Sequence, residues 1–363
     1  MALSNKVLVF RIGQLGDTLV GLPALRVIRE AHSNSKIDLL YDHHVGSNFV
    51  LAEDLLAGSG VIDGFIPYYV GRSPADKIKA VFLYPKLISQ LRRNHYKIVY
   101  HLEPGQKTKL RNLRDQLFFR LAGIKKQSTS SPYRRRRPSD TPLTAVEPEV
   151  DFYLRVLKLQ GLPVPPEPSD YIELQTGEKE NHEWRSWLGS HPLPADKILV
   201  GVGAGSKMQS KQWPLDRYTS VLRELCKEEN VFPVFFGGKE DADPINEMID
   251  NLGVGISACG DLSLKGAIRG LRDMTFYLGN DTGTMHMAVS AGLKCVAVFS
   301  ARDVPGKWYP YGEGHYVHRN AVDCEGCMLT SCIVQKKKCL DAISVEEVLA
   351  SCRRLLASSG VEI

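Results

Sequence analysis

The strongest constraint on the fold is a strand–turn–helix–strand pattern over residues 6–41. The apolar run Lys6–Phe10 has the composition of a strand, and the glycine-containing turn Arg11–Asp17 follows it. Leucine, valine and isoleucine then recur at roughly helical spacing as far as Ile28, before a second apolar run at Ile37–Tyr41. Because such a βαβ unit joins neighbouring parallel strands, the pattern predicts an α/β protein with a parallel sheet.

The same alternation continues along the chain. Further strands are expected at Gly64–Tyr69, Lys97–Leu102, Ile198–Val202, Phe232–Phe236, Thr275–Leu278 and Lys294–Phe299. Further helices are expected at Leu215–Glu228, Pro244–Asn251, Leu264–Leu271, Thr284–Ala291 and Ser344–Leu356. These elements predict two doubly wound, Rossmann-like α/β domains facing one another across a cleft, with ligands beyond the carboxyl ends of the strands.

A proline-rich segment separates the two halves. Gly161–Asp170 contains four prolines in ten residues, which stop a helix and favour a stiff, extended linker. We therefore expect an N-terminal domain at residues 1–168 and a C-terminal domain at 169–343. A terminal amphipathic helix is expected within 344–363, with Ser344 as its N-cap.

The composition is that of an ordinary globular protein. Hydrophobic residues make up 43% of the 363 residues and charged residues 24%, which excludes a disordered chain, a collagen-like repeat and a coiled coil. No apolar run approaches the ~20 residues that span a bilayer, and no charged-then-apolar secretion signal opens the chain. We expect a cytoplasmic protein.

Charge is distributed unevenly between the two halves. Residues 1–170 carry 25 Lys and Arg against 16 Asp and Glu, whereas the remaining residues carry 21 against 25. An excess of this kind indicates that the first half meets an anionic partner, or that it has a basic, solvated surface.

The first turn carries a carboxylate that is a candidate for chemistry. The pattern Gly13-x-x-Gly16-Asp17 is neither the dinucleotide fingerprint G-x-G-x-x-G nor a phosphate loop, which argues against a dinucleotide oxidoreductase. Asp17 lies at the carboxyl end of the first predicted strand. It caps the following helix, or it takes a proton from a hydroxyl nucleophile, and one residue can do both.

Two turns in the second half are candidate anion sites. The first, Gly203–Asp216, includes Ser206 and places Lys211 beside a Trp-Pro pair. Such a turn suits an anion held by backbone N–H groups, with Lys211 supplying a positive charge. The alternative is a surface lysine beside a structural tryptophan. Gly279–His286 places small polar residues between a strand and a helix, where free N–H groups and the helix dipole suit a pyrophosphate.

Two further side chains near these turns have ordinary alternatives. Glu240 follows the predicted strand Phe232–Phe236, where a carboxylate suits ribose hydroxyls or is simply solvated. His286 falls inside a predicted helix, as a core histidine or a ligand-binding one.

Taken together and in order, these motifs resemble glycosyltransferase family 9, the ADP-heptose:lipopolysaccharide heptosyltransferases. The segment Arg11–Arg26 is similar to the first motif of that family, and Lys211–Pro214, Gly279–His286 and Lys307–Gly312 are similar to its later ones. The resemblance runs from about residue 5 to 350. It implies a GT-B fold, with the acceptor on the first domain, the nucleotide-sugar on the second, and the terminal helix packed back on the first.

The resemblance also implies inverting, metal-independent transfer of heptose from ADP-heptose to the lipopolysaccharide inner core. Asp17 becomes the general base that deprotonates the acceptor hydroxyl. Lys211 and the helix start at Thr282, Gly283 and Thr284 stabilise the departing diphosphate in place of a metal cofactor.

The remaining donor-site roles follow in the same way. Asp281 holds sugar hydroxyls, His286 supports the phosphate site and Glu240 binds ribose, with Ser206 in the same site. The sequence departs from the family at Ser300–Asp303, where members often have Gly-Pro-Thr-Asp, which leaves room for another sugar or nucleotide.

The acceptor is expected to be an anionic glycolipid at a membrane surface. Arg11, Gly16 and Asp17 would meet it, together with Arg134, Arg135 and Arg136. Residues 105–137 carry 11 basic residues against one acid, which fits peripheral contact with the cytoplasmic face of the inner membrane or a solvated loop. Nucleic acid is not expected, because no recognition motif accompanies the run.

Four cysteines form a cluster near the end of the chain. Cys324-x₂-Cys327-x₄-Cys332-x₆-Cys339 places four thiols within 16 residues, which is enough for a structural zinc or iron ion in tetrahedral geometry. Reduced or disulfide-paired thiols are the alternative, since the spacing is irregular for a common zinc module. Similar cysteines in the resembled family imply a structural role.

Three functions remain in competition at this point. The chain transfers heptose, transfers another nucleotide-activated sugar to a glycan or protein, or binds glycans without catalysis. The presence of Asp17, Lys211 and Asp281 argues against glycan binding without catalysis.

Overall fold

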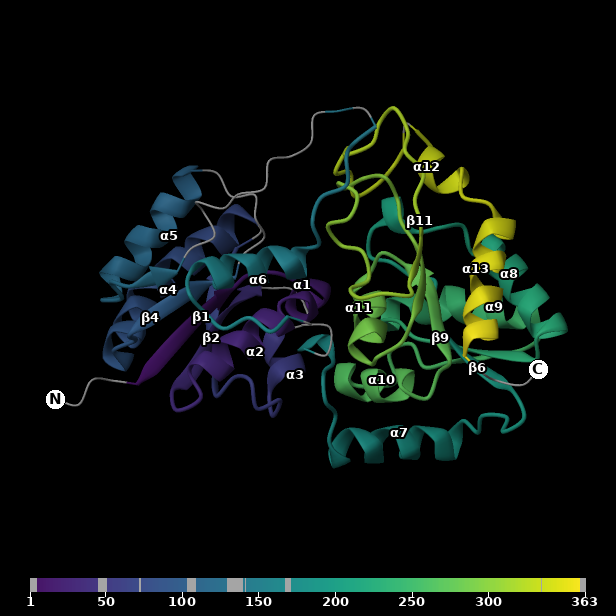
Figure 1. Ribbon diagram of the computed structural model, residues 1–363, viewed down its shortest axis with the longest axis horizontal. Coiled ribbons are helices and arrows are strands. Elements are labelled where there is room, and N and C mark those ends of the chain that lie inside the picture. The colour runs from purple at the N-terminus through teal and green to yellow at the C-terminus, as the bar shows by residue number, and fades with distance from the viewer. Residues whose placement is uncertain are drawn as a thin grey trace. The chain divides into compact units, whose positions relative to one another are not determined.

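The computed structural model describes residues 5–44, 51–71, 73–102, 109–128, 140, 142–166, 171–333 and 335–359. It divides into two compact units (Figure 1). The first comprises the described residues of 1–136 and 149–171, and the second those of 137–148 and 172–363.

The first unit is built on a five-stranded parallel sheet in the order β3-β2-β1-β4-β5. Its strands are β1 (Lys6–Arg11), β2 (Lys36–His44), β3 (Gly64–Val70), β4 (Ile98–His101) and β5 (Gln127–Ser128). The predicted βαβ unit is confirmed, because β1 pairs with β2 in parallel from Lys6↔Lys36 to Arg11↔Tyr41. The chain reverses direction across the sheet between β1 and β4, which places a switch point at the end of β1.

Six helices are described in the first unit. They are α1 (Leu15–Val20), α2 (Leu22–Ala31), α3 (Ala52–Leu56), α4 (Pro74–Asn94), α5 (Lys109–Leu121) and α6 (Glu149–Leu159). The core of this unit centres on Phe10, whose ring meets Tyr68, His101 and Phe119 edge-on at centroid distances of 5.4, 5.8 and 5.2 Å. Helix α4 went unpredicted because it carries exposed apolar residues and contains Pro85, which together blur its helical periodicity.

The second unit contains a six-stranded parallel sheet in the order β11-β10-β9-β6-β7-β8. Its strands are β6 (Ile198–Gly203), β7 (Val231–Phe235), β8 (Ile256–Ser257), β9 (Phe276–Asn280), β10 (Cys295–Val298) and β11 (Tyr316–His318). Strands β6, β9 and β10 are almost continuously apolar and buried, as expected where both faces of a parallel sheet are covered. The order changes direction between β6 and β9, so the second switch point lies at their carboxyl ends.

The second unit also contains helices and two 3₁₀ turns. They are α7 (Glu178–Ser190), η3 (Gln209–Lys211), α8 (Leu215–Glu228), η4 (Lys239–Asp241), α9 (Ala242–Leu252), α10 (Leu264–Leu271), α11 (Gly283–Ser290), α12 (Lys338–Asp341) and α13 (Val345–Ser358). The predicted bounds of α8 and α10 are confirmed to the residue. Burial of one face of each helix against the sheet explains why helical periodicity located them well.

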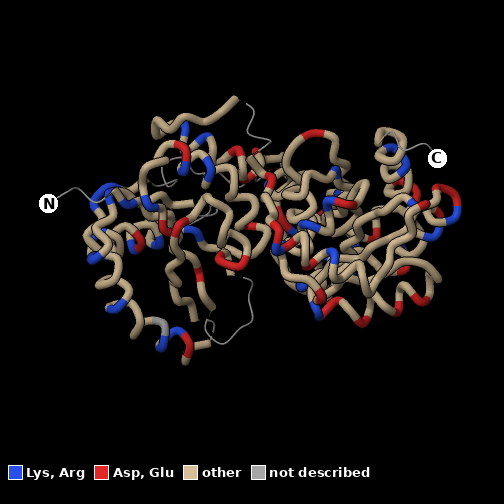
Figure 2. The backbone as a smooth tube through the Cα atoms, turned by 90° about the horizontal axis from the view of Figure 1, so that it is seen from below, with Lys and Arg blue, Asp and Glu red and all other residues tan. Residues whose placement is uncertain are grey.

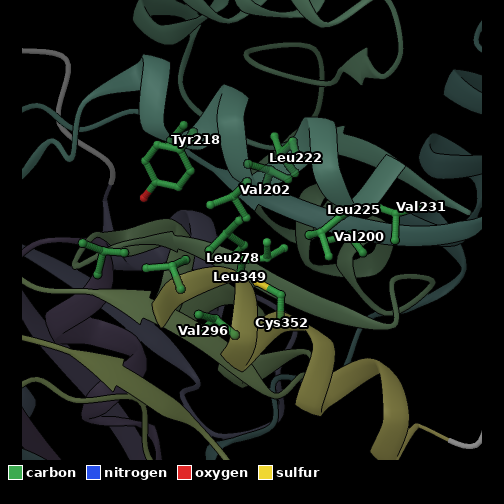
Figure 3. Packing of buried hydrophobic residues seen from close by; sticks show 14 of the residues in the cluster. Val200, Val202, Tyr218, Leu222, Leu225, Val231, Leu278, Val296, Leu349 and Cys352 are labelled. Carbon is green, nitrogen blue, oxygen red and sulfur yellow. The ribbon is translucent and has the colours of Figure 1, made fainter. Parts of the chain in front are cut away.

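The terminal helix α13 is part of the second unit and packs in its core, whereas packing on the first domain was expected. Leu349 and Cys352 lie in one core cluster with Val296 of β10 and Leu278 of β9, and α8 contributes Leu222 (Figure 3). Ser344 caps α13 as predicted, accepting a hydrogen bond from the backbone N–H of Glu347 at 3.2 Å. The apolar face was recognised in the sequence, but the surface that it covers is decided by tertiary packing.

A short segment before α6 also belongs to the second unit, which was not predicted. The backbone N–H of Leu143 donates to Glu325 Oε1 at 2.6 Å, and that of Val146 donates to the carbonyl of Pro305 at 2.9 Å. Gly306 has φ +86°, and a Cβ there would lie 2.2 Å from the carbonyl oxygen of Val146. Glycine is therefore required for this close approach.

No helix within the described ranges is both long and apolar enough to cross a membrane.

A half-buried histidine beside β11 should make the stability of the fold sensitive to acid. The N–H of Cys295 donates to His315 Nδ1 at 3.0 Å, and His315 Nε2 lies 3.1 Å from the carbonyl of Tyr311. Burial lowers the pKa of His315 from 6.5 to about 4, with a smaller contribution from Lys294. Because the unfolded chain binds this proton at a higher pH than the folded chain, the free energy of unfolding should fall as pH drops from about 6.5 towards 4.

We expect this effect to amount to about 2 kcal/mol at pH 5, measured by urea unfolding against pH. His315→Asn retains an acceptor for the N–H of Cys295 and should lose this part of the pH dependence. His95→Asn is the matched control, since His95 is exposed and its left-handed φ of 52° suits asparagine. Equal pH dependence in the wild type and His315→Asn would contradict the assignment.

Candidate active sites at the carboxyl ends of the two sheets

Arg11 closes β1 and is buried, with a side chain 1% exposed. Its Nη1 donates to the carbonyls of Ile12 and Leu102 at 2.7 and 2.9 Å, and its Nη2 donates to the carbonyl of Asp17 at 2.5 Å. Burial alone would lower the pKa of Arg11, but Tyr153, Asp17 and other nearby groups raise it overall. The side chain therefore fixes the shape of the turn after β1. Its expected contact with the acceptor stays a prediction.

Asp17 is the third residue of α1, and the structure shows its capping role. Its Oδ2 accepts the backbone N–H of Gln14 at 2.9 Å, and its Oδ1 lies 3.8 Å from Arg11 Nη2. The side chain is 24% exposed, so the same carboxylate stays accessible to a ligand. Gly13 has φ +149°, and a Cβ there would lie 2.5 Å from Asp17 Cβ, so this turn requires glycine. Gly16 is half-buried in the first turn of α1.

Polar side chains at the ends of β2 and β4 join this edge of the sheet, and the sequence analysis missed them. Asp42 Oδ1 accepts the N–H of Gly13 at 2.9 Å, while Asp42 Oδ2 lies 2.8 Å from His44 Nε2. His101 ends β4, the other neighbour of β1, and is buried. The signal was present in the sequence, because Asp42, His44 and His101 follow or end predicted strands whose carboxyl ends meet at one edge.

In the second unit, two of the predicted donor-site residues form an ion pair. Lys211 Nζ lies 2.7 Å from Asp281 Oδ2, and the two side chains are 16% and 6% exposed. Lys211 comes from η3, which follows the loop after β6, and Asp281 comes directly after β9. Neighbouring strands thus bring together two residues to which separate roles had been assigned.

Asn280 positions this pair, which the sequence analysis did not recognise. It is fully buried, and its Nδ2 donates to the carbonyl of Ala204 at 2.7 Å. Its Oδ1 accepts from the N–H of Trp213 at 3.0 Å and from the hydroxyl of Tyr218 at 2.9 Å. One amide therefore joins the loop after β6, the start of α8 and the end of β9. The sequence feature that could have identified Asn280 is a polar residue at the end of an apolar strand.

The start of α11 lies directly beyond Asp281. Thr282 is its N-cap and makes no side-chain cap to the helix, while Thr282, Gly283 and Thr284 are all half-buried. The first N–H groups of α11 thus adjoin the Lys211–Asp281 pair, as an anion site at a helix N-terminus requires. His286 is buried within α11, as the core alternative predicted.

Ser206 and Glu240 lie on loops of the same edge. Ser206 Oγ accepts the N–H of Met208 at 3.1 Å, and its carbonyl accepts from Gln212 Nε2 at 2.9 Å. Glu240 Oε1 lies 3.4 Å from Lys207 Nζ, and the glutamate side chain is half exposed. A hydrogen bond from its own backbone N–H, helped by Lys207, lowers the pKa of Glu240, which therefore favours the carboxylate that would bind hydroxyls.

A cavity of about 200 Å³ opens beside these loops. Its lining comprises Ala204, Gly205, Gln212, Trp213, Pro214, Leu215, Asp241, Pro244, Ile245 and Lys337. A Cβ on Gly205 would lie 2.2 Å from Asp241 Oδ1, so glycine lets this carboxylate reach the loop after β6. Burial raises the pKa of Asp241. Asp241, adjacent to Glu240, was not among the predicted residues.

Cys324 lies in the turn at residues 323–326 and Cys339 on the helix α12, with Cys327 and Cys332 on the segment between them. Burial, Asp323 and the nearby Cys327 and Cys339 raise the pKa of the Cys324 thiol, and burial together with Cys332 raises that of Cys339. Within the residues that the structure describes, however, no three His, Cys, Asp or Glu side chains are arranged to hold a metal. The predicted Arg134, Arg135 and Arg136 lie outside the described residues.

Comparison with known proteins gives one family. The model of glycosyltransferase family 9 (heptosyltransferase) matches residues 85–338. A lipooligosaccharide heptosyltransferase 2 of Campylobacter jejuni subsp. jejuni serotype O:2 is 22% identical over 169 residues, which are 45% of this chain and 52% of that protein. The aligned region thus spans about half the length of this curated relative.

Three solved structures share the fold. The family 9 glycosyl transferase of Veillonella parvula aligns with a TM-score of 0.73 at 21% identity, covering 99% of both chains. The ADP-heptose lps heptosyltransferase II of E. coli aligns with a TM-score of 0.67 at 20% identity, over 97% of this chain and 99% of that one. The iron-containing dodecameric glycosyltransferase TibC of enterotoxigenic E. coli reaches 0.55 at 14% identity, over 97% and 76%.

These alignments confirm the expected GT-B fold of two Rossmann-like domains, each built on a parallel sheet. The family model covers well over half of the chain and includes the Lys211–Asp281 pair. The chain belongs to glycosyltransferase family 9, the heptosyltransferases.

Proposed function

We propose that the protein transfers heptose from ADP-heptose to the lipopolysaccharide inner core, with Kdo or heptose as the acceptor, at the cytoplasmic face of the inner membrane. Family membership supports the reaction class. The observation that carries the proposal is the arrangement at the second switch point, where Lys211, Asp281 and the start of α11 adjoin. A lysine beside a helix N-terminus suits the diphosphate of a nucleotide-sugar.

Asp17 acts as the general base in an inverting displacement. Its carboxylate takes the proton of the acceptor hydroxyl as the oxygen forms a bond to the anomeric carbon of the sugar. The bond between that carbon and the diphosphate breaks, and the diphosphate leaves with the electron pair. The exposed fraction of 24% supports this role, and the hydrogen bond from Gln14 holds the carboxylate in one orientation.

The second unit receives the negative charge that develops on the leaving group. Lys211 and the N–H groups at Thr282–Thr284 stabilise the diphosphate and take the place of a metal ion. Asp281 holds Lys211 in the absence of donor and turns to the sugar hydroxyls when the diphosphate attracts the lysine. Glu240 and Ser206 bind the nucleoside, with the Glu240 carboxylate on the ribose, and His286 supports the helix start.

A second candidate is transfer of another nucleotide-activated sugar, to a glycan or a protein. The departure from the family pattern at Ser300–Asp303 favours it, because this loop follows β10 on the same edge of the sheet. Arg302 is buried there and donates to the carbonyls of Leu329 and Met328 at 2.8 and 2.9 Å. Its side chain therefore ties this loop to the segment at Met328 and Leu329.

The test is sugar transfer to heptose-deficient lipopolysaccharide, with ADP-heptose and other nucleotide-sugars offered separately in EDTA. Transfer from ADP-heptose that survives chelation supports the proposal. Preference for another donor would leave the assigned fold unchanged but show that the transferred sugar is not heptose. Nucleotide binding without turnover on any acceptor would instead favour a glycan-binding relative.

We also infer that Cys324, Cys327, Cys332 and Cys339 hold a structural zinc or iron ion. Four sulfur donors within 16 residues suit either metal. Cys339 lies on α12, while Cys332 Sγ accepts the N–H of Lys337 at 3.4 Å, so an ion would tie this segment to the turn at Cys324.

Elemental analysis of the purified protein should find about one metal ion per chain, and Cys324→Ser/Cys339→Ser should lose it. We expect the unfolding temperature of this variant to be lower than that of the wild type by roughly 4 °C or more. Cys226→Ser is the matched control, since Cys226 is partly buried in α8 and lies outside the cluster. Wild-type protein without metal, with four titratable thiols or a disulfide, would contradict the inference.

A further inference from the structure

Helix α5 carries a stripe of leucines that faces away from the core. Leu110, Leu113, Leu117 and Leu121 are between 49% and 78% exposed. Their spacings of three, four and four residues place them on one face of the helix. An apolar helix face normally packs against a core, so this stripe requires a different explanation.

The opposite face of α5 already fills that packing role. Phe119 and Ala122, just beyond the helix end, are buried in the core of the first unit, and Asp115 is buried beside them. Phe118 packs edge-on against Tyr68 of β3 at a centroid distance of 5.8 Å. The helix is therefore anchored by one face, and its leucine stripe is left for a partner outside this unit.

The first half of α4 repeats the arrangement beside it. Ile78, Val81 and Phe82 are between 57% and 78% exposed, whereas Leu87 and Leu91 of the same helix are buried in the core. Helices α4 and α5 are neighbours (Figure 1), joined through the rings of Tyr84 and Phe118 at 6.2 Å. We call the seven exposed residues the α4–α5 face: Ile78, Val81, Phe82, Leu110, Leu113, Leu117 and Leu121.

Basic side chains flank this face on both helices. They include the exposed Lys77, Lys79, Lys86, Arg111, Arg114 and Arg120. The acids of the two helices are engaged locally: Asp76 accepts from Ser73 at the start of α4, and Asp115 is buried against Arg114 at 2.6 Å. Figure 2 shows how frequent lysine and arginine are on the unit that contains the N-terminus. The two helices thus combine exposed apolar residues with exposed cations.

This charge pattern distinguishes between two occupants. A second copy of the chain bound through the same face would bring two sets of like charges together across a self-complementary interface. A bilayer with anionic headgroups instead supplies an apolar interior for the leucines and counter-charge for the lysines and arginines. We propose that the α4–α5 face docks on the surface of an anionic lipid bilayer, with its leucines and Phe82 at the acyl boundary.

The inference names the membrane contact that the proposed function needs, but it concerns lipid alone. Vesicle binding requires neither sugar donor nor acceptor, and turnover can be followed separately with a water-soluble acceptor. Loss of one readout therefore leaves the other informative.

The test is flotation of the full-length protein with vesicles of phosphatidylcholine mixed with phosphatidylglycerol, and with vesicles of phosphatidylcholine alone. We expect binding to the anionic vesicles that weakens in high salt, and little binding to the neutral ones. Leu113→Gln/Leu117→Gln should reduce the partition constant by about tenfold or more, because two leucines no longer enter the apolar region. Lys77→Gln/Lys79→Gln/Lys86→Gln should reduce it by roughly fivefold per charge at low salt.

Leu159→Gln/Ile333→Gln is the matched control, since these two residues are 57% and 80% exposed and lie outside the face. This variant should bind vesicles like the wild type, and all variants should turn over a water-soluble acceptor at wild-type rates. Unchanged vesicle binding by the leucine variant would overturn the proposal. So would a dimer in sedimentation that the leucine variant converts to a monomer, without vesicle binding by the wild type.

Discussion

Asp17→Asn should lower the turnover number by roughly 10²–10⁴, the range that a lost general base accounts for. The amide cannot take the hydroxyl proton, but it keeps an oxygen that accepts the N–H of Gln14 as Oδ2 does at 2.9 Å. The cap is therefore mostly retained, and the free energy of unfolding should change by no more than about 1 kcal/mol. The measurement is steady-state transfer from ADP-heptose, beside urea unfolding of the same variant.

Asp216→Asn is the matched control for this experiment. Asp216 also lies in the first turn of a helix, α8, where it interacts with the helix dipole. It should lose a few tenths of a kcal/mol of stability and retain its turnover. If Asp17→Asn kept more than about a tenth of wild-type turnover, the carboxylate would be a helix cap and the base would have to be sought elsewhere.

Lys211→Gln should lower the turnover number by about 10²–10³, because the leaving diphosphate loses its principal cation. The same change leaves the Asp281 carboxylate, 6% exposed, without its partner at 2.7 Å. We expect this to cost up to about 3 kcal/mol of unfolding free energy. Single variants therefore mix a catalytic effect with a structural one.

A second substitution separates the two effects. Lys211→Gln/Asp281→Asn removes the unpaired charge, so stability should return towards wild type while turnover stays low. Lys265→Gln is the matched control, since Lys265 forms a similarly shielded pair with Glu180 at 3.4 Å, with side chains 15% and 8% exposed. It should lose comparable stability but keep turnover. Recovery of turnover in the double variant would show that Lys211 acts only by neutralising Asp281.

Several residues of the candidate site could be located from the sequence because they follow strands. Asp17, Lys211 and Asp281 each come shortly after an apolar run, and parallel strands place their carboxyl ends at one edge. Asn280, Asp42 and His101 were missed, although they occupy equivalent positions. Their importance depends on which strands become neighbours, and that order is not written in any local pattern.

The alternation of apolar runs and amphipathic segments by itself determined the two parallel sheets, the bounds of α8 and α10 and the Ser344 cap. The helix bounds and the cap depend on contacts between residues close together in the chain, and the parallel arrangement follows from the alternation of strands and helices, although the strand pairs themselves join distant segments. Only the tertiary structure decided that Lys211 pairs with Asp281, that α13 packs against α8 and that the leucines of α5 remain exposed. Those outcomes depend on strand order and on which surfaces are already covered, so they arise from long-range packing rather than from local pattern.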